Sequence, residues 1–360
     1  MFVFALTQVT SRLAADPTWG GLLRGLLVLA ALWWAWAAYA WLTDTLNVDE
    51  GGVRLAMFGA MGAMLVAALA VPGAFEDEAV LFAAAYLLVR VLHLVLYMIA
   101  ARRDPDVLGA VLRLTPTAVA APAFLVLAGF LDGAPQIAAW IAALVVDYVG
   151  PALGGGRGWR VQPAHFAERH ALIVIIALGE SIVAIGAGAT GLAVDLGLVA
   201  SALCGIVVVA ALWWLYFDVV AIVAQRRLSE AAGVARARMA RDSYSYLHFP
   251  MVAGIVLFAL ALKKTLADHD GGLSTIPAVG LCGGIALYLL AHVAFRLRNV
   301  RTLNRQRLIL AALLLALIPA ATEVPALVAL GVAAALTAGL VAYEAIRYRE
   351  ARARVRAQLA

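Results

Sequence analysis

The sequence has little charge. Only 14% of its 360 residues are Asp, Glu, Lys or Arg, whereas 65% are hydrophobic. A soluble chain carries roughly 25% charged and about 45–50% apolar residues, so this chain has too little charge to cover a water-facing surface. The scarcity excludes a soluble enzyme and a nucleic-acid-binding domain. The net charge of +5 does not make nucleic acid a partner, because the basic residues lie between apolar runs.

Cysteine is also scarce. Cys204 and Cys282 both lie inside apolar runs, and neither has a second cysteine at metal-binding spacing. This excludes a secreted disulfide scaffold and makes a zinc site unexpected. The glycine-rich stretch GGGRG at 154–158 lacks the GK[ST] of a phosphate-binding loop. We therefore predict no metal site and no cofactor.

Long apolar runs dominate what is present. They recur at about twenty residues, the length that spans a bilayer as a helix. A β-barrel is excluded because its strands would alternate between apolar and polar residues. We predict an all-α polytopic membrane protein with about twelve transmembrane helices, the first of them truncated. The expected spans are 1–13, 21–42, 53–71, 78–100, 107–130, 134–153, 168–190, 195–224, 243–263, 274–295, 307–322 and 324–346.

Basic residues divide unevenly between the two sides that these spans define. With the N-terminus in the cytoplasm, 21 of the 27 Lys and Arg residues fall on inside segments and 4 on outside segments. Cytoplasmic loops of membrane proteins carry such an excess. The bias predicts a multi-pass protein of the plasma membrane, in contact with membrane lipids, with both termini in the cytoplasm.

A weak internal repeat is visible. The letters ALWW occur at 31–34 and again at 211–214, and His93 and His292 lie at the same depth of the fourth helix of each half. Parallel repeats of this kind are known in transporters. We predict two parallel six-helix repeats, a Gly/Arg-rich cytoplasmic linker between them and a basic cytoplasmic tail, with boundaries at 1–153, 154–167, 168–346 and 347–360.

Two ionisable residues fall near the middle of predicted spans. Glu180 lies about twelve residues, or roughly 18 Å, from the inside end of its helix, and Arg90 lies at a similar depth. An ionised side chain at the helix centre costs about 2.5–3.5 kcal/mol, so we expect the two to form an ion pair. One interpretation is that the pair only locks two helices together; the other is that Glu180 is a proton or cation site.

Further polar residues fall nearer the inside ends of the spans. Asp218, His248, His170 and Asp147 are of this kind, and each alone is typical of a satisfied structural group. Together they predict a water-accessible vestibule that opens to the cytoplasm and ends at Glu180.

Three functions remain open at this point. The first is a secondary transporter or channel-like protein for a proton, ion or small molecule, with Glu180 as its site and Arg90 as the counter-charge. The second is a membrane-embedded enzyme acting on a lipid or small amphiphile, with His170 or His248 as acid or base. The third is a non-catalytic membrane-adaptation or scaffold protein. The oligomeric state stays open.

Several stretches carry a family resemblance. FAERHALIVIIALGESIVAIG (Phe166–Gly186), SYLHFPMVAGIV (Ser245–Val256), ALWWLYF and the opening VFALTQVT resemble the bacterial low temperature requirement protein A family, over essentially the whole chain. The resemblance implies a polytopic bacterial inner-membrane protein linked to growth in the cold, and it carries over no substrate, reaction or catalytic residue.

The chain departs from the family pattern at its start. It opens at Met1, inside a stretch that in the family resembles ELFFDLVFVFAL. A thirteen-residue helix spans about 20 Å, short of the roughly 30 Å hydrocarbon core. We therefore expect either a truncated first helix or a start upstream of Met1.

Overall fold

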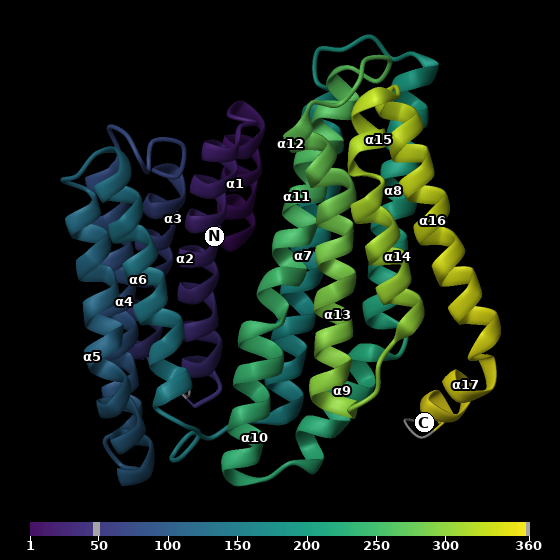
Figure 1. The fold of residues 1–360 in the computed structure, drawn as a ribbon. Helices are drawn as coiled ribbons and strands as arrows, with labels where there is room; N and C mark the ends of the chain where they lie inside the picture. The colour runs from purple at the N-terminus through teal and green to yellow at the C-terminus, as the bar shows by residue number, and fades with distance from the viewer. Residues whose placement is uncertain (46–50, 358–360) are drawn as a thin grey trace. The chain divides into compact units, whose positions relative to one another are not determined.

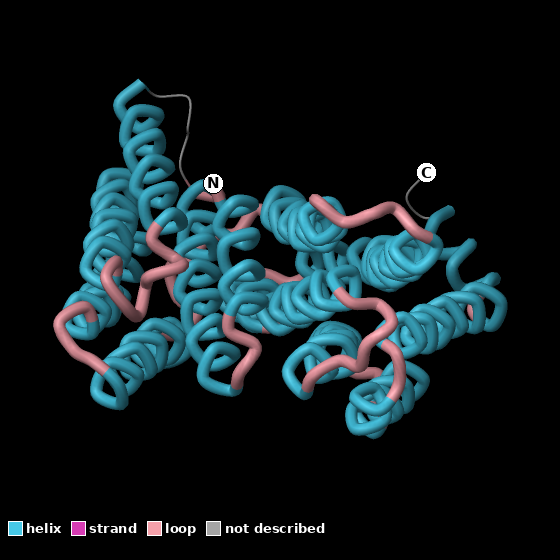
Figure 2. The backbone as a smooth tube through the Cα atoms, turned by 90° about the horizontal axis from the view of Figure 1, so that it is seen from above, coloured by secondary structure: helices cyan, strands magenta, loops and turns pink. Residues whose placement is uncertain are grey.

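The chain is helical throughout the residues that the computed structural model describes, 1–45 and 51–357 (Figure 1). Within these ranges there is no strand, only an isolated bridge between Gly272 and Pro325. Short loops join the helices, as the view from above shows (Figure 2). The prediction of an all-α membrane protein is therefore confirmed.

Two compact units divide the chain. Unit 1 comprises Met1–Arg12, Gly20–Phe166 and Ala231–Arg241; unit 2 comprises Leu13–Trp19, Ala167–Glu230 and Asp242–Ala360. This division does not test a symmetry between the units, so the parallel repeat with its boundaries stays a prediction.

Unit 1 contains most of α1 and the five helices that follow it. Their bounds are α1 Phe2–Ala15, α2 Trp19–Thr43, α3 Gly51–Leu69, α4 Ala79–Ala101, α5 Pro105–Ala128, α6 Gly133–Leu153 and, later in the chain, α10 Gly233–Met239. Helix α5 shows why these segments begin where they do. Asp104 caps its first turn by accepting from the amides of Asp106 and Val107, and Pro105 follows at a position where no amide N–H is needed.

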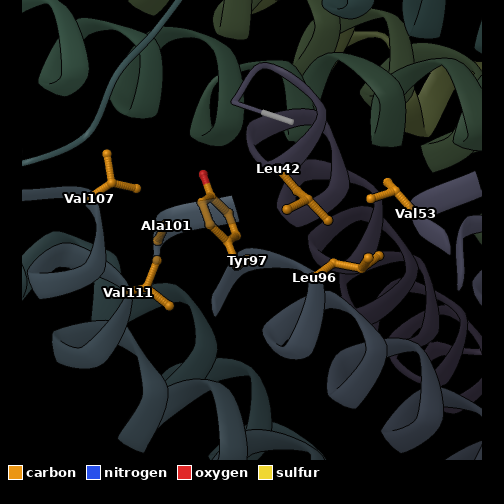
Figure 3. Packing of buried hydrophobic residues seen from close by; sticks show 7 residues of the cluster. All are labelled: Leu42, Val53, Leu96, Tyr97, Ala101, Val107 and Val111. Atoms are coloured by element: carbon orange, nitrogen blue, oxygen red, sulfur yellow. The ribbon is translucent and has the colours of Figure 1, made fainter. Parts of the chain in front are cut away.

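Part of the core of unit 1 lies where four of its helices meet. Leu42 of α2, Val53 of α3, Tyr97 of α4 and Val111 of α5 are all buried there, together with Leu96, Ala101 and Val107 (Figure 3). The Tyr97 hydroxyl donates to the carbonyl of Trp41 at 3.2 Å, so its polar end is satisfied. Outward-facing residues of the same helices are apolar too: Leu55 and Phe58 are more than half exposed, as lipid-facing side chains would be.

Unit 2 is built on α7 and the helices from α8 onward, except α10. Their bounds are α7 Pro163–Ala189, α8 Leu196–Phe217, α9 Val220–Glu230, the π-helix η1 Ala240–Tyr246, α11 His248–Ala267, α12 Thr275–Ala278, the π-helix η2 Val279–Gly283, α13 Gly284–Val300, α14 Arg305–Ala316, α15 Ile318–Glu323, α16 Ala326–Arg347 and α17 Arg349–Ala357.

Helices α11 and α13 lie side by side and approach very closely (Figure 1). A Cβ atom on Gly254 would lie 2.5 Å from the carbonyl oxygen of Gly284, and one on Gly284 would lie 2.7 Å from that of Gly254. Only glycine permits this backbone contact, which is a common device for packing helices in membranes. It makes α11 and α13 the centre of unit 2.

The number of spans differs from the prediction of twelve. Within the described residues, ten helical segments are long and apolar enough to cross a membrane. Helix α1 has only 14 residues, fewer than a span needs. The expected span 307–322 is divided into α14, of 12 residues, and α15, of 6 residues. The break falls at Leu317 because Pro319, in the first turn of α15, has no amide N–H to continue the α14 ladder.

Two segments outside the predicted spans are largely helical. The Arg-rich stretch 225–242 holds the second half of α9, all of α10 and the start of η1, and the basic tail contains α17. The glycine-rich linker turns at Gly155 and Gly158, whose φ angles of 69° and 85° are accessible to glycine at little cost.

The π-helix η1 leads directly into α11. Pro250 lies just beyond it, and the ring of a proline clashes with the carbonyl four residues earlier and cannot donate to it. In η1 the amide of Leu247 donates to Asp242 O at 3.2 Å, five residues back. In a regular α-helix that amide would donate to Ser243 O. The π turn therefore leaves the Ser243 carbonyl available to a side chain.

Candidate functional site

Arg90 of α4 is ion-paired with Asp147 of α6. Arg90 Nη2 lies 2.6 Å from Asp147 Oδ1, the two side chains are 2% and 4% exposed, and the Tyr86 hydroxyl donates to Asp147 Oδ2 at 3.2 Å. This corrects the expectation of an Arg90–Glu180 pair. A buried arginine needs a carboxylate, but the one that α4 meets is on α6 of the same unit, because helix neighbours decide the partner and depth alone does not.

The surroundings of this pair are aromatic and closed. His93, one turn along α4, contacts the carbonyl of Ala38 through Nε2 at 3.1 Å, so Nε2 carries the proton. Tyr39 and Tyr97 pack against the His93 ring, with centroids 5.5 and 5.3 Å away. Within the described residues, Arg90 Nε and Nη1 and His93 Nδ1 are buried without a hydrogen-bond partner. The pair is thus sealed inside unit 1.

His248, at the start of α11, is held by two hydrogen bonds. Its Nδ1 lies 2.9 Å from the Ser243 carbonyl that η1 leaves available, so Nδ1 carries the proton. Its Nε2 then has a free lone pair, to which the Tyr216 hydroxyl of α8 donates at 2.7 Å. Both rings are fully buried. The backbone geometry of η1 thereby fixes the tautomer and orientation of this histidine.

His292 of α13 is the second histidine of unit 2. Arg307 Nη1 lies 2.9 Å from His292 Nδ1, and because arginine only donates, Nδ1 is the acceptor and Nε2 carries the proton. Arg307 also binds Glu344 of α16 in a bidentate way, with Nε to Oε1 at 3.0 Å and Nη2 to Oε2 at 2.8 Å. Asn304 Nδ2 donates to the same carboxylate at 3.0 Å.

The rings between these two histidines form a continuous row. The centroid of Tyr216 is 5.7 Å from that of His292 and 5.6 Å from that of His248. Beyond His248, the ring of Tyr244 stacks on it at 5.2 Å, and the ring of His170 of α7 lies 5.3 Å away. We call Glu344, Arg307, His292, Tyr216, His248, Tyr244 and His170 the polar row; all its members belong to unit 2.

One end of the polar row reaches a cavity of about 190 Å³. Arg307 and Glu344 line this cavity, together with Arg296 and the α17 residue Arg352. The side chains of Arg307 and Glu344 are 7% and 15% exposed, so the outer end of the row is only partly buried. His170, His248 and His292, by contrast, are at most 1% exposed. The row therefore runs from a partly exposed edge beside the cavity into the fully buried interior of unit 2.

Asp218, just after α8, lies on the wall of the same cavity. Arg352 Nε is 2.6 Å from Asp218 Oδ2, and Arg352 Nη2 donates to Oδ1 at 2.8 Å. The Arg352 guanidinium also lies over the ring of Trp214, 5.4 Å from its centroid. Both charged side chains are largely buried, at 11% and 15% exposure.

Glu180 is buried in the middle of α7, with 1% of its surface exposed. The next residue, Ser181, is fully buried, and its hydroxyl has no hydrogen-bond partner among the described residues. Along α7, Glu180 lies ten residues beyond His170, or about 15 Å. The same helix thus carries the inner end of the polar row and this carboxyl group.

The structure brings some of the predicted site residues together and separates others. Arg90 meets Asp147 in unit 1, and His170 meets His248 in unit 2, while Asp218 lies at the cavity. Four members of the polar row were not predicted as site residues from the sequence: Tyr216, His292, Arg307 and Glu344. A weak signal existed, because Glu344 is an acid inside the predicted span 324–346, although close to its end. Within the described residues, no three His, Cys, Asp or Glu side chains are grouped as metal ligands.

Comparisons with known proteins agree with the resemblance seen in the sequence. The profile of the bacterial low temperature requirement A family matches residues 1–342. A curated protein of Rhizobium meliloti (strain 1021), described as uncharacterised, is 32% identical over 304 residues, which cover 80% of this chain and 73% of that protein. No solved structure matches the chain significantly. The chain is an integral membrane protein and belongs to the bacterial low temperature requirement A (LtrA) family.

Proposed function

We propose that the protein is a transport-type membrane protein that moves protons through unit 2, with the polar row as the proton path. The single observation that carries this is the row of ionisable and hydroxyl groups from the Arg307–Glu344 pair to the buried His248, in which Arg307 is hydrogen-bonded to His292, Tyr216 is hydrogen-bonded to His248, and the rings of His292 and Tyr216 pack 5.7 Å apart. Histidine and carboxylate groups inside a membrane mark proton relays and ion paths. A row of this kind has no use in mere helix packing, where apolar side chains would serve as well.

The assigned protons give the row a direction. His292 Nε2 carries a proton and has no hydrogen-bond partner among the described residues, the Tyr216 hydroxyl donates to His248 Nε2, and His248 Nδ1 donates to Ser243 O. A proton placed on His292 Nδ1 would release the Nε2 proton. A water molecule or a movement of the rings would then carry that proton to the Tyr216 hydroxyl, which would pass its own to His248. His292 then returns to neutral, and His248 becomes imidazolium. Arg307 donates to His292 Nδ1, so it must move away before a proton can bind to that nitrogen. Its salt bridge with Glu344 therefore controls the entry of protons into the row.

Glu180 is the deeper site of this proposal. An ionised carboxyl at mid-helix is costly in a membrane, which favours a group that takes up and releases a proton. His170 and Glu180 share α7, so a proton leaving His248 for His170 would be carried to the helix that bears Glu180. The alternative of a lipid enzyme with His170 or His248 as base is less well supported, because both rings are fully buried in this conformation.

The location in the cell also belongs to the proposal. The cavity is lined by three arginines, and the Arg-rich ends of the helices are the ends that positive-inside bias assigns to the cytoplasm. We infer an inner-membrane protein of bacteria with both termini and the cavity in the cytoplasm. Single cysteines placed at Arg301 and at Asp270 test this by labelling of intact cells, and only the second is expected to react with an impermeant maleimide.

Proton flux into proteoliposomes tests the function. The purified chain is reconstituted, a membrane potential is imposed with potassium and valinomycin, and internal pH is followed with a trapped dye. We expect flux above that of protein-free liposomes, and at least about a tenfold loss in Tyr216→Phe, which removes only the relaying hydroxyl, equivalent to about 1.4 kcal/mol in the barrier. Glu180→Gln should cause a comparable loss.

The matched control is Tyr97→Phe, which removes a hydroxyl that donates to a backbone carbonyl in unit 1. It should keep the flux of the unmodified protein. Flux no greater than that of empty liposomes, or equal losses in Tyr216→Phe and Tyr97→Phe, would contradict the proposal.

A further inference from the structure

Arg296, one turn before the end of α13, is an exposed arginine that a single hydrogen bond orients. Its Nε donates to Thr302 Oγ1 at 2.8 Å. Among the residues that the structure describes, the Nη1 and Nη2 atoms of Arg296 make no hydrogen bond and no ion pair. A guanidinium held in this way presents an edge of N–H donors whose planar geometry matches the oxygens of a phosphate or a carboxylate.

Arg296 also lies on the wall of the cavity at the outer end of the polar row, where two acids already have arginine partners. Glu344 binds Arg307 in a bidentate pair, while Arg296 acts on Glu344 only at a distance. Asp218 is paired with Arg352. The cavity wall therefore holds one more arginine than acid, and Arg296 is the arginine outside these ion pairs.

Positive charge is also in excess along the chain around Arg296. The segment 296–307 contains five arginines and no Asp or Glu. Two of the five, Arg298 and Arg307, are ion-paired with acids from elsewhere in unit 2. The remaining three are exposed and form no ion pair within the described residues. This excess of positive charge favours an anionic partner.

An apolar groove of about 190 Å³ adjoins Arg296. It lies between α9 and α13, which are neighbours in unit 2. Val220 and Val223 line it from α9, and Phe295 and Val300 line it from α13. An apolar groove with an arginine on its wall fits a molecule that has an apolar part and an anionic part.

Asn299 is a second polar residue on the wall of the groove, and its amide is already satisfied. Its Oδ1 accepts from Ser243 Oγ at 2.7 Å, and its Nδ2 donates to Phe295 O at 2.9 Å. Arg296 can therefore bind a ligand without breaking a hydrogen bond, whereas Asn299 cannot. An uncharged apolar molecule would leave the guanidinium unused, and a free phosphate would leave the apolar walls unused.

The groove lies where the apolar spans give way to arginine. The two segments that form it, Leu196–Glu230 and Thr275–Val300, are both long and apolar enough to cross a membrane. Arginines appear only in their last turns, at Arg226 in the first and at Arg296 in the second. Arginines at the ends of spans lie at the level of the lipid headgroups, and basic pockets between spans there bind anionic headgroups.

We propose that this groove binds an anionic phospholipid, with its phosphate on Arg296 and part of one acyl chain between α9 and α13. The phosphate oxygens accept from Nη1 and Nη2, and Val223 and Phe295 contact the acyl chain. Because Arg296 also lines the cavity beside Arg307 and Glu344, the lipid lies next to the outer end of the polar row. The inference needs no proton movement and is independent of the proposed function.

Native mass spectrometry of the full chain in detergent micelles tests the inference, with dioleoyl phosphatidylglycerol as the probe. We expect the unmodified protein to bind it saturably, more tightly than the zwitterionic dioleoyl phosphatidylethanolamine. It should also bind it at least about tenfold more tightly than sn-glycerol 3-phosphate, which has a phosphate and no acyl chain. Arg296→Ala should weaken the binding of phosphatidylglycerol at least about tenfold, as expected for the loss of a hydrogen bond to a charged group.

Arg349→Ala is the matched control. It removes the same charge from an exposed arginine of α17 that lines neither the groove nor the cavity, and it should bind phosphatidylglycerol as the unmodified protein does. A second variant, Val223→Phe, fills the groove without a change in charge. It should weaken the binding of phosphatidylglycerol about fourfold, the equivalent of one buried CH₂ group, and leave that of sn-glycerol 3-phosphate unchanged.

Each other result overturns the inference. Equal losses in Arg296→Ala and Arg349→Ala would mean that the lipid responds only to the general positive potential. Equal affinities for sn-glycerol 3-phosphate and phosphatidylglycerol would make Arg296 a site for free phosphates. Unchanged binding in Val223→Phe, with an unchanged melting temperature, would mean that no acyl chain enters the groove. Because this assay does not depend on proton flux, its failure beside a normal Tyr216→Phe effect would leave the proposed function in place.

Discussion

The two units each bury an arginine–carboxylate pair near a histidine, but the pairs differ in their access to water. In unit 1, Arg90 and Asp147 are 2% and 4% exposed. In unit 2, Arg307 and Glu344 are 7% and 15% exposed and line one. The comparison teaches that a fully buried arginine–carboxylate pair stabilises the fold. The same pair can separate where water or a ligand can take the place of one partner.

The histidines differ in the same sense. His93 ends on the backbone carbonyl of Ala38, whereas His292 is joined on one side to Arg307 and faces Tyr216 on the other. A hydrogen bond to a backbone carbonyl fixes the orientation of the imidazole ring. The carbonyl has no proton of its own to donate, so it cannot pass a proton onward. The tyrosine beside His292, Tyr216, is hydrogen-bonded to a second histidine, whereas the Tyr97 hydroxyl beside His93 donates to a backbone carbonyl.

The largest effect should come from breaking the sealed pair. Asp147→Ala leaves the Arg90 guanidinium buried without a counter-charge and should destabilise the protein by about 3–5 kcal/mol. The double variant Arg90→Met with Asp147→Leu removes both charges and should recover most of that loss. Denaturant titration of the purified protein in micelles measures both. A double variant no more stable than Asp147→Ala would show that the pair is not merely structural.

Glycine packing gives the next contrast between the units. Gly254→Ala would push a Cβ against the Gly284 carbonyl in unit 2 and should cost about 1–3 kcal/mol. In unit 1, a Cβ on Gly59 would meet only the Leu92 side chain at an ordinary 3.7 Å, so Gly59→Ala should stay within about 0.5 kcal/mol. Melting temperatures of the two single variants make the comparison. Equal shifts would mean that α11 and α13 do not form the tight centre of unit 2.

A milder loss is expected for the partly exposed pair. Glu344→Gln keeps hydrogen-bond acceptance but removes the charge facing Arg307, and cavity water can replace part of the lost interaction. We expect a cost of about 1–2 kcal/mol, smaller than that of Asp147→Ala. Proton flux should change far more than stability, because Arg307 is no longer held in its gating position. The same stability assay and the proteoliposome assay, run on one preparation, separate the two effects.

The positions of most membrane-spanning helices can be predicted from hydropathy. The partners of the site residues depend instead on which helices pack together. Apolar runs placed nearly all spans, because lipid leaves no alternative to helix for an apolar chain. The partner of Arg90 could not be predicted from hydropathy, because Asp147 and Glu180 are both buried acids. Arg90 pairs with Asp147 because α4 and α6 bring these two side chains together. Arg307 and Glu344 were overlooked because each lies near a helix end, where charge is usually solvated.

The π-helix η1 has a consequence for how the polar row could be switched. Its backbone hydrogen bonds reach five residues back, one more than in an α-helix, and rewinding the segment as an α-helix would return Leu247 N to Ser243 O. His248 would then lose the acceptor that sets its tautomer and could swivel. A local change in the winding of η1, far smaller than the tilt of a whole helix, would therefore be enough to form or break the hydrogen bond between Tyr216 and His248 in the polar row.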